Sequence, residues 1–192
     1  MTEAKQAAFI YINGYPGVGK LTVANELCKL LPNAKVVSNH LLIDPVAAVF
    51  ERTAREYQPL RRALRRELLT SLAAAESTRD VTWIFTDQQS SNELGSSTAK
   101  EYQIAAALRG SPFISVILSC ELDENLRRAV GEGRGNGSNT KLTDLAILRT
   151  IRQGEDIFHF RAETEMELDL TDLSPSEAGR KIYEHVCSTV SM

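Results

Sequence analysis

The chain has 192 residues, of which 43% are hydrophobic and 24% are charged, as is typical of one folded domain. This composition excludes a disordered or fibrous chain, and a net charge of −3 gives no global positive field for nucleic acid or an anionic membrane. We therefore expect a single domain over residues 1–192, with neither a nucleic-acid nor a membrane partner. Three distant cysteines and an N-terminus without a signal-peptide pattern favour a reducing, cytoplasmic location.

Short apolar runs alternate with longer helical patterns along the whole chain. Strands are expected at residues 8–13, 35–37, 81–85, 113–119 and 166–170. Helices are expected at residues 21–31, 45–78 with an interruption near Pro59, 97–109, 122–130, 141–160 and 175–190. Strand–helix alternation with nearly continuous apolar strands predicts an α/β fold, in which helices cover both faces of a parallel sheet. Ligands bind beyond the carboxyl ends of such strands, so a site is expected in the loops that follow them.

The loop after the first expected strand is rich in glycine and ends in a lysine. It comprises Gly14, Tyr15, Pro16, Gly17, Val18, Gly19, Lys20, Leu21 and Thr22. Its glycines allow backbone N–H groups to turn inward around an anion, and Lys20 adds a positive charge. The pattern GxxxxGK follows a strand and opens a helix, which is the setting of the Walker A motif, and it predicts nucleotide binding. Leu21 stands where the motif has a Mg²⁺-binding hydroxyl, so we expect Thr22 to bond the α-phosphate instead.

Residues 14–22 read Gly-x-Pro-Gly-x-Gly-Lys-x-Thr, which resembles the adenylate-kinase-like branch of P-loop proteins with the same displaced hydroxyl. The whole chain looks like that superfamily of small-molecule kinases, which includes shikimate kinase and chloramphenicol phosphotransferase. The resemblance implies a three-layer α/β/α P-loop NTPase fold, whose five-stranded parallel sheet has the order 2-3-1-4-5. It also implies ATP and Mg²⁺, an acceptor-binding region at about residues 39–77 and a lid over the phosphates at about residues 127–143.

Acidic residues and a histidine follow the second and third expected strands. Asp87 looks like the superfamily's Walker B aspartate, because a carboxylate beside the phosphate loop can hold Mg²⁺ through water. In related kinases an Asp after the second strand accepts the acceptor's proton, but Asn39 occupies that place here and an amide cannot act as a base. His40 and Asp44 are the candidates for this role. The alternatives are structural: His40 as a satisfied histidine, and Asp44 as an N-cap before Pro45.

Arginines and lysines gather in two parts of the chain. The first group lies in and beside the Gly-rich segment 131–139 and comprises Arg127, Arg128, Arg134, Lys141, Arg149 and Arg152. The resemblance implies that Arg128 and Arg134 stabilise the transferring phosphoryl group, and the alternative is a solvated surface loop. The second group comprises Arg52, Arg55, Arg61, Arg62, Arg65 and Arg66. These residues either bind an anionic acceptor or pair with acidic residues of the chain.

Taken together, these features predict an ATP-binding P-loop protein whose partner is a small-molecule acceptor. The leading hypothesis is a kinase that transfers the γ-phosphoryl group of ATP to a nucleoside, nucleotide or metabolite. Its catalytic residues would be Lys20, Asp44, Asp87, Arg128 and Arg134. The resemblance also implies that adenine lies against the loop after the last strand, which makes Thr171 a further nucleotide contact. Two alternatives are an ATPase of the same fold without an acceptor, and a nucleotide-binding sensor with little catalysis.

Overall fold

A computed structural model describes residues 7–131, 144–154 and 156–190 of the chain. Its strands are β1 (Phe9–Gly14), β2 (Ala34–Ser38), β3 (Thr82–Thr86), β4 (Phe113–Ser119) and β5 (Met166–Asp169). They form one sheet in the order β2-β3-β1-β4-β5, and every neighbouring pair is parallel. This confirms the predicted sheet and its order.

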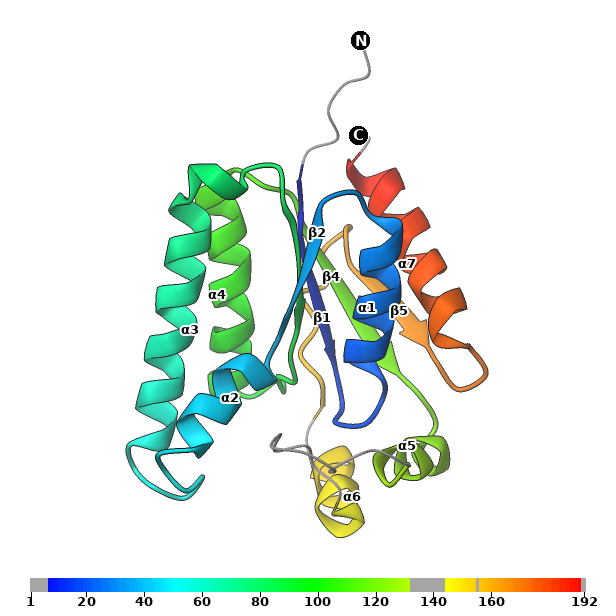
Figure 1. Cartoon of the computed structure of the whole chain (residues 1–192). Helices are drawn as coiled ribbons and strands as arrows, with labels where there is room; N and C mark the ends of the chain where they lie inside the picture. The colour runs from blue at the N-terminus through cyan, green and yellow to red at the C-terminus, as the bar shows by residue number, and fades with distance from the viewer. Residues whose placement is uncertain (1–6, 132–143, 155, 191–192) are drawn as a thin grey trace.

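Helices cover both faces of the sheet (Figure 1). One face carries α1 (Lys20–Leu30) and α7 (Pro175–Val190), and the other carries α3 (Tyr57–Ala74) and α4 (Glu93–Arg109). Three shorter helices, α2 (His40–Ala47), α5 (Leu122–Ala129) and α6 (Leu145–Gly154), lie at the end of the sheet where the strands terminate. A short 3-10 helix spans Glu76–Thr78. None of the helices in the described part of the chain has the length and apolar character needed to cross a membrane.

The central strand β1 is buried along its whole length and divides the core into two parts. Because successive strand residues point to opposite faces, Ile10 and Ile12 pack on the side of α1 and α7. On the other side Tyr11 joins an aromatic cluster, with ring centroids 4.9 Å from Tyr102. Burial on both faces explains why the central strands read as unbroken apolar runs.

The helical region expected at residues 45–78 consists of two helices separated by residues 48–56. Pro59 does not interrupt it but lies in the first turn of α3, where its missing N–H removes no intrahelical hydrogen bond. The expected N-cap role of Asp44 is also wrong, because α2 begins at His40 and Asp44 lies inside it.

The helix expected at residues 141–160 is shorter than predicted. Residues 141–143 lie outside the described part of the chain, and α6 spans only Leu145–Gly154. Residues 156–165 instead run beside the sheet, where Ile157 forms an antiparallel bridge with Ser90. By contrast, the predicted bounds of β4 and α7 are confirmed residue for residue.

Candidate functional site

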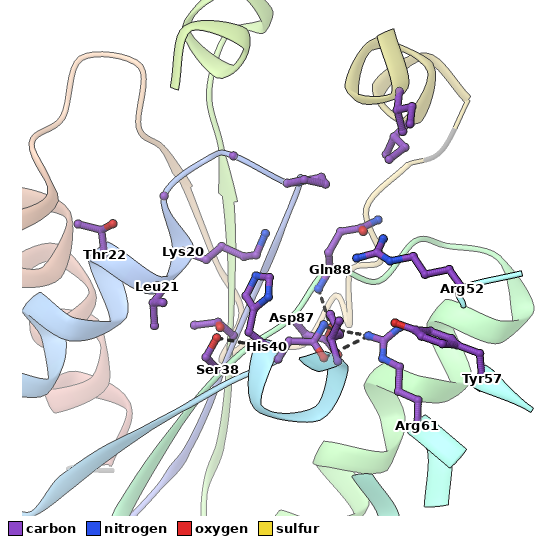
Figure 2. A pocket seen from close by; sticks show the side chains of 18 of the residues that line it. Lys20, Leu21, Thr22, Ser38, His40, Arg52, Tyr57, Arg61, Asp87 and Gln88 are labelled. Atoms are coloured by element: carbon purple, nitrogen blue, oxygen red, sulfur yellow. Dashed lines mark hydrogen bonds and ion pairs between the residues drawn. The ribbon is translucent and has the colours of Figure 1, made fainter. Parts of the chain in front are cut away.

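A cavity of about 360 Å³ opens at the carboxyl end of the sheet. Its walls come from the phosphate loop at residues 14–22, α2, α3, the end of β3 and α6 (Figure 2). It therefore lies where ligands bind in parallel α/β sheets, beside the glycine-rich loop that the sequence selects.

The phosphate loop depends on its glycines. Gly17 and Gly19 have φ angles of 92° and 110°, which side chains rarely tolerate. A Cβ atom at Gly17 would lie 2.7 Å from Nδ2 of Asn125, and one at Gly14 would collide with the carbonyl oxygen of Leu118. Packing against β4 and α5 thus leaves no room for side chains at Gly14 and Gly17, and the positive φ angles give the loop backbone a conformation that suits the binding of an anion.

Lys20 begins α1 and extends into the cavity (Figure 2). Its Nζ donates to the carbonyl oxygens of Gly14 at 2.6 Å and Tyr15 at 2.8 Å, so the ammonium lies across the mouth of the loop. Leu21 is partly buried and Thr22 is exposed, and Figure 2 shows Thr22 apart from the side chains around Asp87. The first turn of α1 thus brings the positive charge to the cavity, as predicted from the motif.

The other loop residues divide between the cavity, the core and a second pocket. Pro16, Gly17 and Gly19 line the cavity with Lys20. Val18 is fully buried in the core, whereas the ring of Tyr15 lines a different pocket on the far side of the loop.

Asp87 follows β3 and is only 1% exposed. Its Oδ1 accepts from Nδ2 of Asn39 at 2.5 Å and from the backbone N–H of Gln88 at 2.8 Å. Its Oδ2 accepts from Nε2 of Gln89 at 2.8 Å. These bonds fix the carboxylate and occupy both oxygens, a donor set that fits a Mg²⁺ ion held through water rather than directly.

Asn39 connects Asp87 to α3. Its Oδ1 accepts from Nη2 of Arg61 at 3.1 Å, and the same Nη2 lies 4.0 Å from Oδ1 of Asp87. The sequence contains no local signal for this link, because the residues lie far apart along the chain and meet only through the fold.

His40 and Asp44, the two candidate bases, lie one helical turn apart on α2. Nδ1 of His40 lies 3.7 Å from Oδ1 of Asp44. His40 lines the cavity and Asp44 does not. The structure therefore brings the histidine to the cavity and places the carboxylate behind it.

The second arginine group divides between the two predicted roles. Arg52 and Arg61 line the cavity. The others lie elsewhere: Arg65 is buried and donates to Glu101 at 2.7 Å, Arg66 donates to Glu101 at 3.1 Å, Arg55 donates to Glu56 at 2.6 Å, and Arg62 is exposed. Pairing with acidic residues is thus observed for Arg55, Arg65 and Arg66, whereas Arg52 and Arg61 are the members that line the cavity.

Arg128 and Thr171 lie together beyond β5, outside the lining of the cavity. Arg128 donates to the carbonyl oxygens of Val18 at 3.1 Å and Leu170 at 2.7 Å. It also donates to Glu124 at 2.5 Å, and hydrogen bonds from Arg127 and Arg128 lower the pKa of Glu124 to about 2. Arg128 thus joins the phosphate loop to the loop expected to contact adenine.

The remaining basic residues of the first group lie elsewhere. Arg134, Lys141 and most of the expected lid at 127–143 lie outside the described residues. Arg149 is exposed, and the guanidinium of Arg152 lies 4.8 Å from the centre of the Tyr15 ring.

Several lining residues were not selected from the sequence. They are Ser38, Ile43, Tyr57, Gln58, Thr86, Gln88, Ile147 and Ile151. Three of them carried a usable signal: Gln88 directly follows Asp87, and Ile147 and Ile151 are spaced to share one face of a helix.

A model of a family described as AAA domain matches residues 10–147. The sequence matches no curated protein. Solved structures of kinases resemble the chain along nearly its whole length. A gluconokinase from Sinorhizobium meliloti 1021 has a TM-score of 0.64 at 13% identity, covering 97% of this chain and 95% of that one.

Two further kinases have the same fold. An APS kinase from Mycobacterium tuberculosis, in complex with AMPPNP and APS, has a TM-score of 0.60 at 17% identity, covering 94% of this chain and 98% of that one. A shikimate kinase from Bacteroides thetaiotaomicron has a TM-score of 0.57 at 15% identity, covering 96% and 99%. At these identities the likeness establishes the fold that the chain shares with these proteins.

Proposed function

The chain belongs to the AAA domain family and has the fold of the P-loop small-molecule kinases, and from this premise we propose that it is an ATP-dependent kinase of a small acceptor. One observation carries the proposal: Lys20 of the phosphate loop and Arg52 and Arg61 of the expected acceptor region line the same cavity. A phosphoryl donor and an anionic acceptor would meet in that space.

We assign the nucleotide to the phosphate loop at residues 14–22. Its backbone N–H groups and Lys20 would hold the phosphates, and Asp87 would hold Mg²⁺ through water. Arg128 and Thr171 would contact the nucleotide beyond β5, and Arg134 would approach the phosphates from the lid at about 127–143. Bound Mg·ATP supplies the phosphoryl group, and the protein positions it and offsets its charge.

His40 is the proposed base for the acceptor hydroxyl, and Asp44 is its positioning residue. The imidazole lines the cavity, whereas Oδ1 of Asp44 lies 3.7 Å from its Nδ1. At this distance the carboxylate would act on the ring through its negative charge, and Nε2 would accept the proton. This assignment moves Asp44 from a direct to an indirect role.

The proposed acceptor carries a phosphate or carboxylate group and binds between α2 and α3, within the expected acceptor region at about 39–77. Two guanidinium groups, of Arg52 and Arg61, face the cavity beside the Tyr57 ring. Arginine suits planar anions because its donors form a fixed fork.

We place this reaction in the cytoplasm. Cys28, Cys120 and Cys187 form no disulfide in the described part of the chain, which is the state in which a reducing compartment keeps cysteines.

The decisive experiment measures ADP release from Mg·ATP, alone and with separate pools of nucleotides, phosphorylated sugars, carboxylic acids and neutral nucleosides. We expect stimulation by one anionic pool, lost in Lys20→Ala. Lys29→Ala is the matched control, because Lys29 is exposed on the same helix and pairs with Glu26. A release that no pool changes would contradict the kinase proposal.

The alternative is an ATPase of the same fold. It is favoured by Asn39, whose amide stands where related kinases have a catalytic carboxylate and is engaged with Asp87 and Arg61. Steady ADP release without any acceptor, lost in Lys20→Ala, would support this second function. Binding of ATP without release would support a sensor.

A further inference from the structure

A second cavity, of about 570 Å³, shares no lining residue with the first among the residues described. It lies between Tyr15 of the phosphate loop, the end of β4 and residues 156–161. His159 and Glu167 form part of its wall. The proposed kinase reaction makes no use of this part of the molecule.

Three potential metal ligands converge at the edge of this cavity. Nδ1 of His159 lies 3.3 Å from Oε1 of Glu165 and 3.3 Å from Oε1 of Glu167. The three atoms all lie within 4.8 Å of one another. The residues come from the chain that enters β5 and from β5 itself, so the fold brings them together.

The two separations from His159 match the spacing of neighbouring ligands around a metal ion. Nitrogen and oxygen ligands about 2.0–2.2 Å from Zn²⁺ lie about 3.0–3.4 Å apart in octahedral or tetrahedral geometry. Both contacts to His159 fall within that interval. Two carboxylates that converge on one imidazole also repel each other, and a divalent cation between them relieves that repulsion.

Glu165 is held in place as a ligand would be. Its side chain is only 6% exposed. Its Oε2 accepts from Oγ of Ser115 at 2.6 Å and from the backbone N–H of Phe160 at 2.8 Å, while Oε1 accepts from the N–H of Arg161 at 3.1 Å. Such outer contacts orient ligating carboxylates in metal sites.

The backbone between the ligands is unusual as well. Arg161 has a φ of 54°, one of two positive values at residues other than glycine in the described chain. Arg161 lies between His159 and Glu165 in the chain, and its backbone N–H donates to Oε1 of Glu165. A positive φ at a residue other than glycine is uncommon, and it persists where the surrounding structure holds the backbone in that conformation.

We propose that His159, Glu165 and Glu167 form a binding site for a divalent transition-metal ion, with Zn²⁺ as the best match. One imidazole and two carboxylates suit Zn²⁺, whereas Mg²⁺ prefers oxygen ligands in octahedral geometry and retains water. Water or a small ligand from the adjacent cavity would complete the coordination of the ion. The ion would tie residues 159–161 to β5, next to the phosphate loop but apart from the Mg²⁺ proposed at Asp87.

The test is a calorimetric titration of the metal-free full-length protein with Zn²⁺, in excess Mg²⁺ and without nucleotide. We expect one equivalent bound, with affinity reduced at least about tenfold in His159→Ala and Glu167→Gln. Matched controls are His185→Ala and Glu163→Gln, which alter nearby residues outside the cluster and should bind Zn²⁺ like the wild type.

Thermal unfolding provides the second measurement. Zn²⁺ should raise the Tm of the wild type and of both controls, but not that of His159→Ala. Circular dichroism would first show that this variant is folded. No saturable binding, or binding that His159→Ala leaves unchanged, would reduce the cluster to an ion pair and overturn the proposal. Because no nucleotide is present, neither result depends on the kinase proposal.

Discussion

The side-chain amide of Asn39 donates to Oδ1 of Asp87 at 2.5 Å and so joins the end of β2 to the end of β3. Its oxygen accepts from Arg61, so one amide links the carboxylate proposed for Mg²⁺ to an arginine proposed for the acceptor. An aspartate at position 39 would bring two carboxylates into contact instead. The geometry therefore gives a physical reason for an amide at this position.

The hydrogen bonds of Asn39 predict that two variants of this residue differ in how their free energy of unfolding depends on pH. Asn39→Ala removes both hydrogen bonds, and we expect it to lower the free energy of unfolding by about 1–3 kcal/mol at all pH values. Asn39→Asp should cost a similar amount at pH 7 through carboxylate repulsion. Its deficit should shrink toward pH 5, because one carboxyl of the pair takes up a proton and donates again. Urea unfolding at both pH values measures this, and parallel deficits would contradict it.

Glu124 should contribute to stability only above acidic pH. Arg127 and Arg128 lower its pKa from 4.5 to about 2, so its charged form is favoured in the folded state. This contribution is complete above the unfolded pKa and is lost as pH falls through the folded one. We expect the Tm difference between wild type and Glu124→Gln to be constant near neutral pH and to shrink between pH 4.5 and pH 2. Asp123→Asn, an exposed neighbour, should show a much smaller change.

Gly17 should not tolerate a side chain. An alanine there would adopt a φ of 92° and bring its Cβ to 2.7 Å from Nδ2 of Asn125. We expect Gly17→Ala to lower the free energy of unfolding by about 1–3 kcal/mol, measured in urea. Gly154→Ala is the control, since no atom lies within 4 Å of its added Cβ. Equal stability of the two variants would contradict the strain at Gly17.

Arg109 should stabilise the fold without affecting the cavity. Its guanidinium is buried on α4 and donates to the carbonyl oxygens of Leu72 in α3, of Ala75 directly after α3 and of Thr78 in the 3-10 helix. Arg109→Met removes a buried donor shared by these carbonyls, and we expect a loss of about 2–4 kcal/mol in thermal or urea unfolding.

Two comparisons separate this structural role from a functional one. Arg66→Met removes an exposed arginine and should cost under about 1 kcal/mol. Nucleotide affinity of folded Arg109→Met should equal that of the wild type, and a selective loss of affinity would argue against a purely structural role.

Arg52 should affect the acceptor rather than ATP. Because Arg52 lines the cavity, Arg52→Gln should raise the KM for an anionic acceptor about tenfold or more and leave the KM for ATP nearly unchanged. Arg62→Gln changes an exposed arginine on α3 and should alter neither constant. Steady-state kinetics of both variants would check this, and an equal effect of the two would exclude a specific contact.

Local patterns predicted most of the fold. The apolar runs found the five strands, and the glycines with Lys20 located the phosphate loop, because both signals lie within a few consecutive residues. The predicted elements were wrong where the structure depends on contacts between residues far apart in the sequence. Residues 156–165 are not helical: Ile157 pairs with Ser90, and Glu165 accepts from Ser115, which no local pattern reveals.

In the candidate site, too, residues with a local sequence signal were predicted and those that depend on long-range contacts were not. Lys20, His40 and Asp87 were found because each lies at the end of a strand or in a motif. The hydrogen bond between Asn39 and Arg61 was not predicted, because the two residues lie 22 positions apart in the sequence and belong to different elements. The prediction for Arg134 concerns a residue outside the described part of the chain.

The bonds of Arg128 have an entropic consequence. Val18 belongs to the loop expected to hold phosphates, and Leu170 precedes the loop expected to contact the base. One guanidinium sets the distance between these two segments before any nucleotide arrives. The two segments are therefore already ordered in the folded protein. A nucleotide that contacts both does not have to order them, so its binding loses less free energy to conformational entropy.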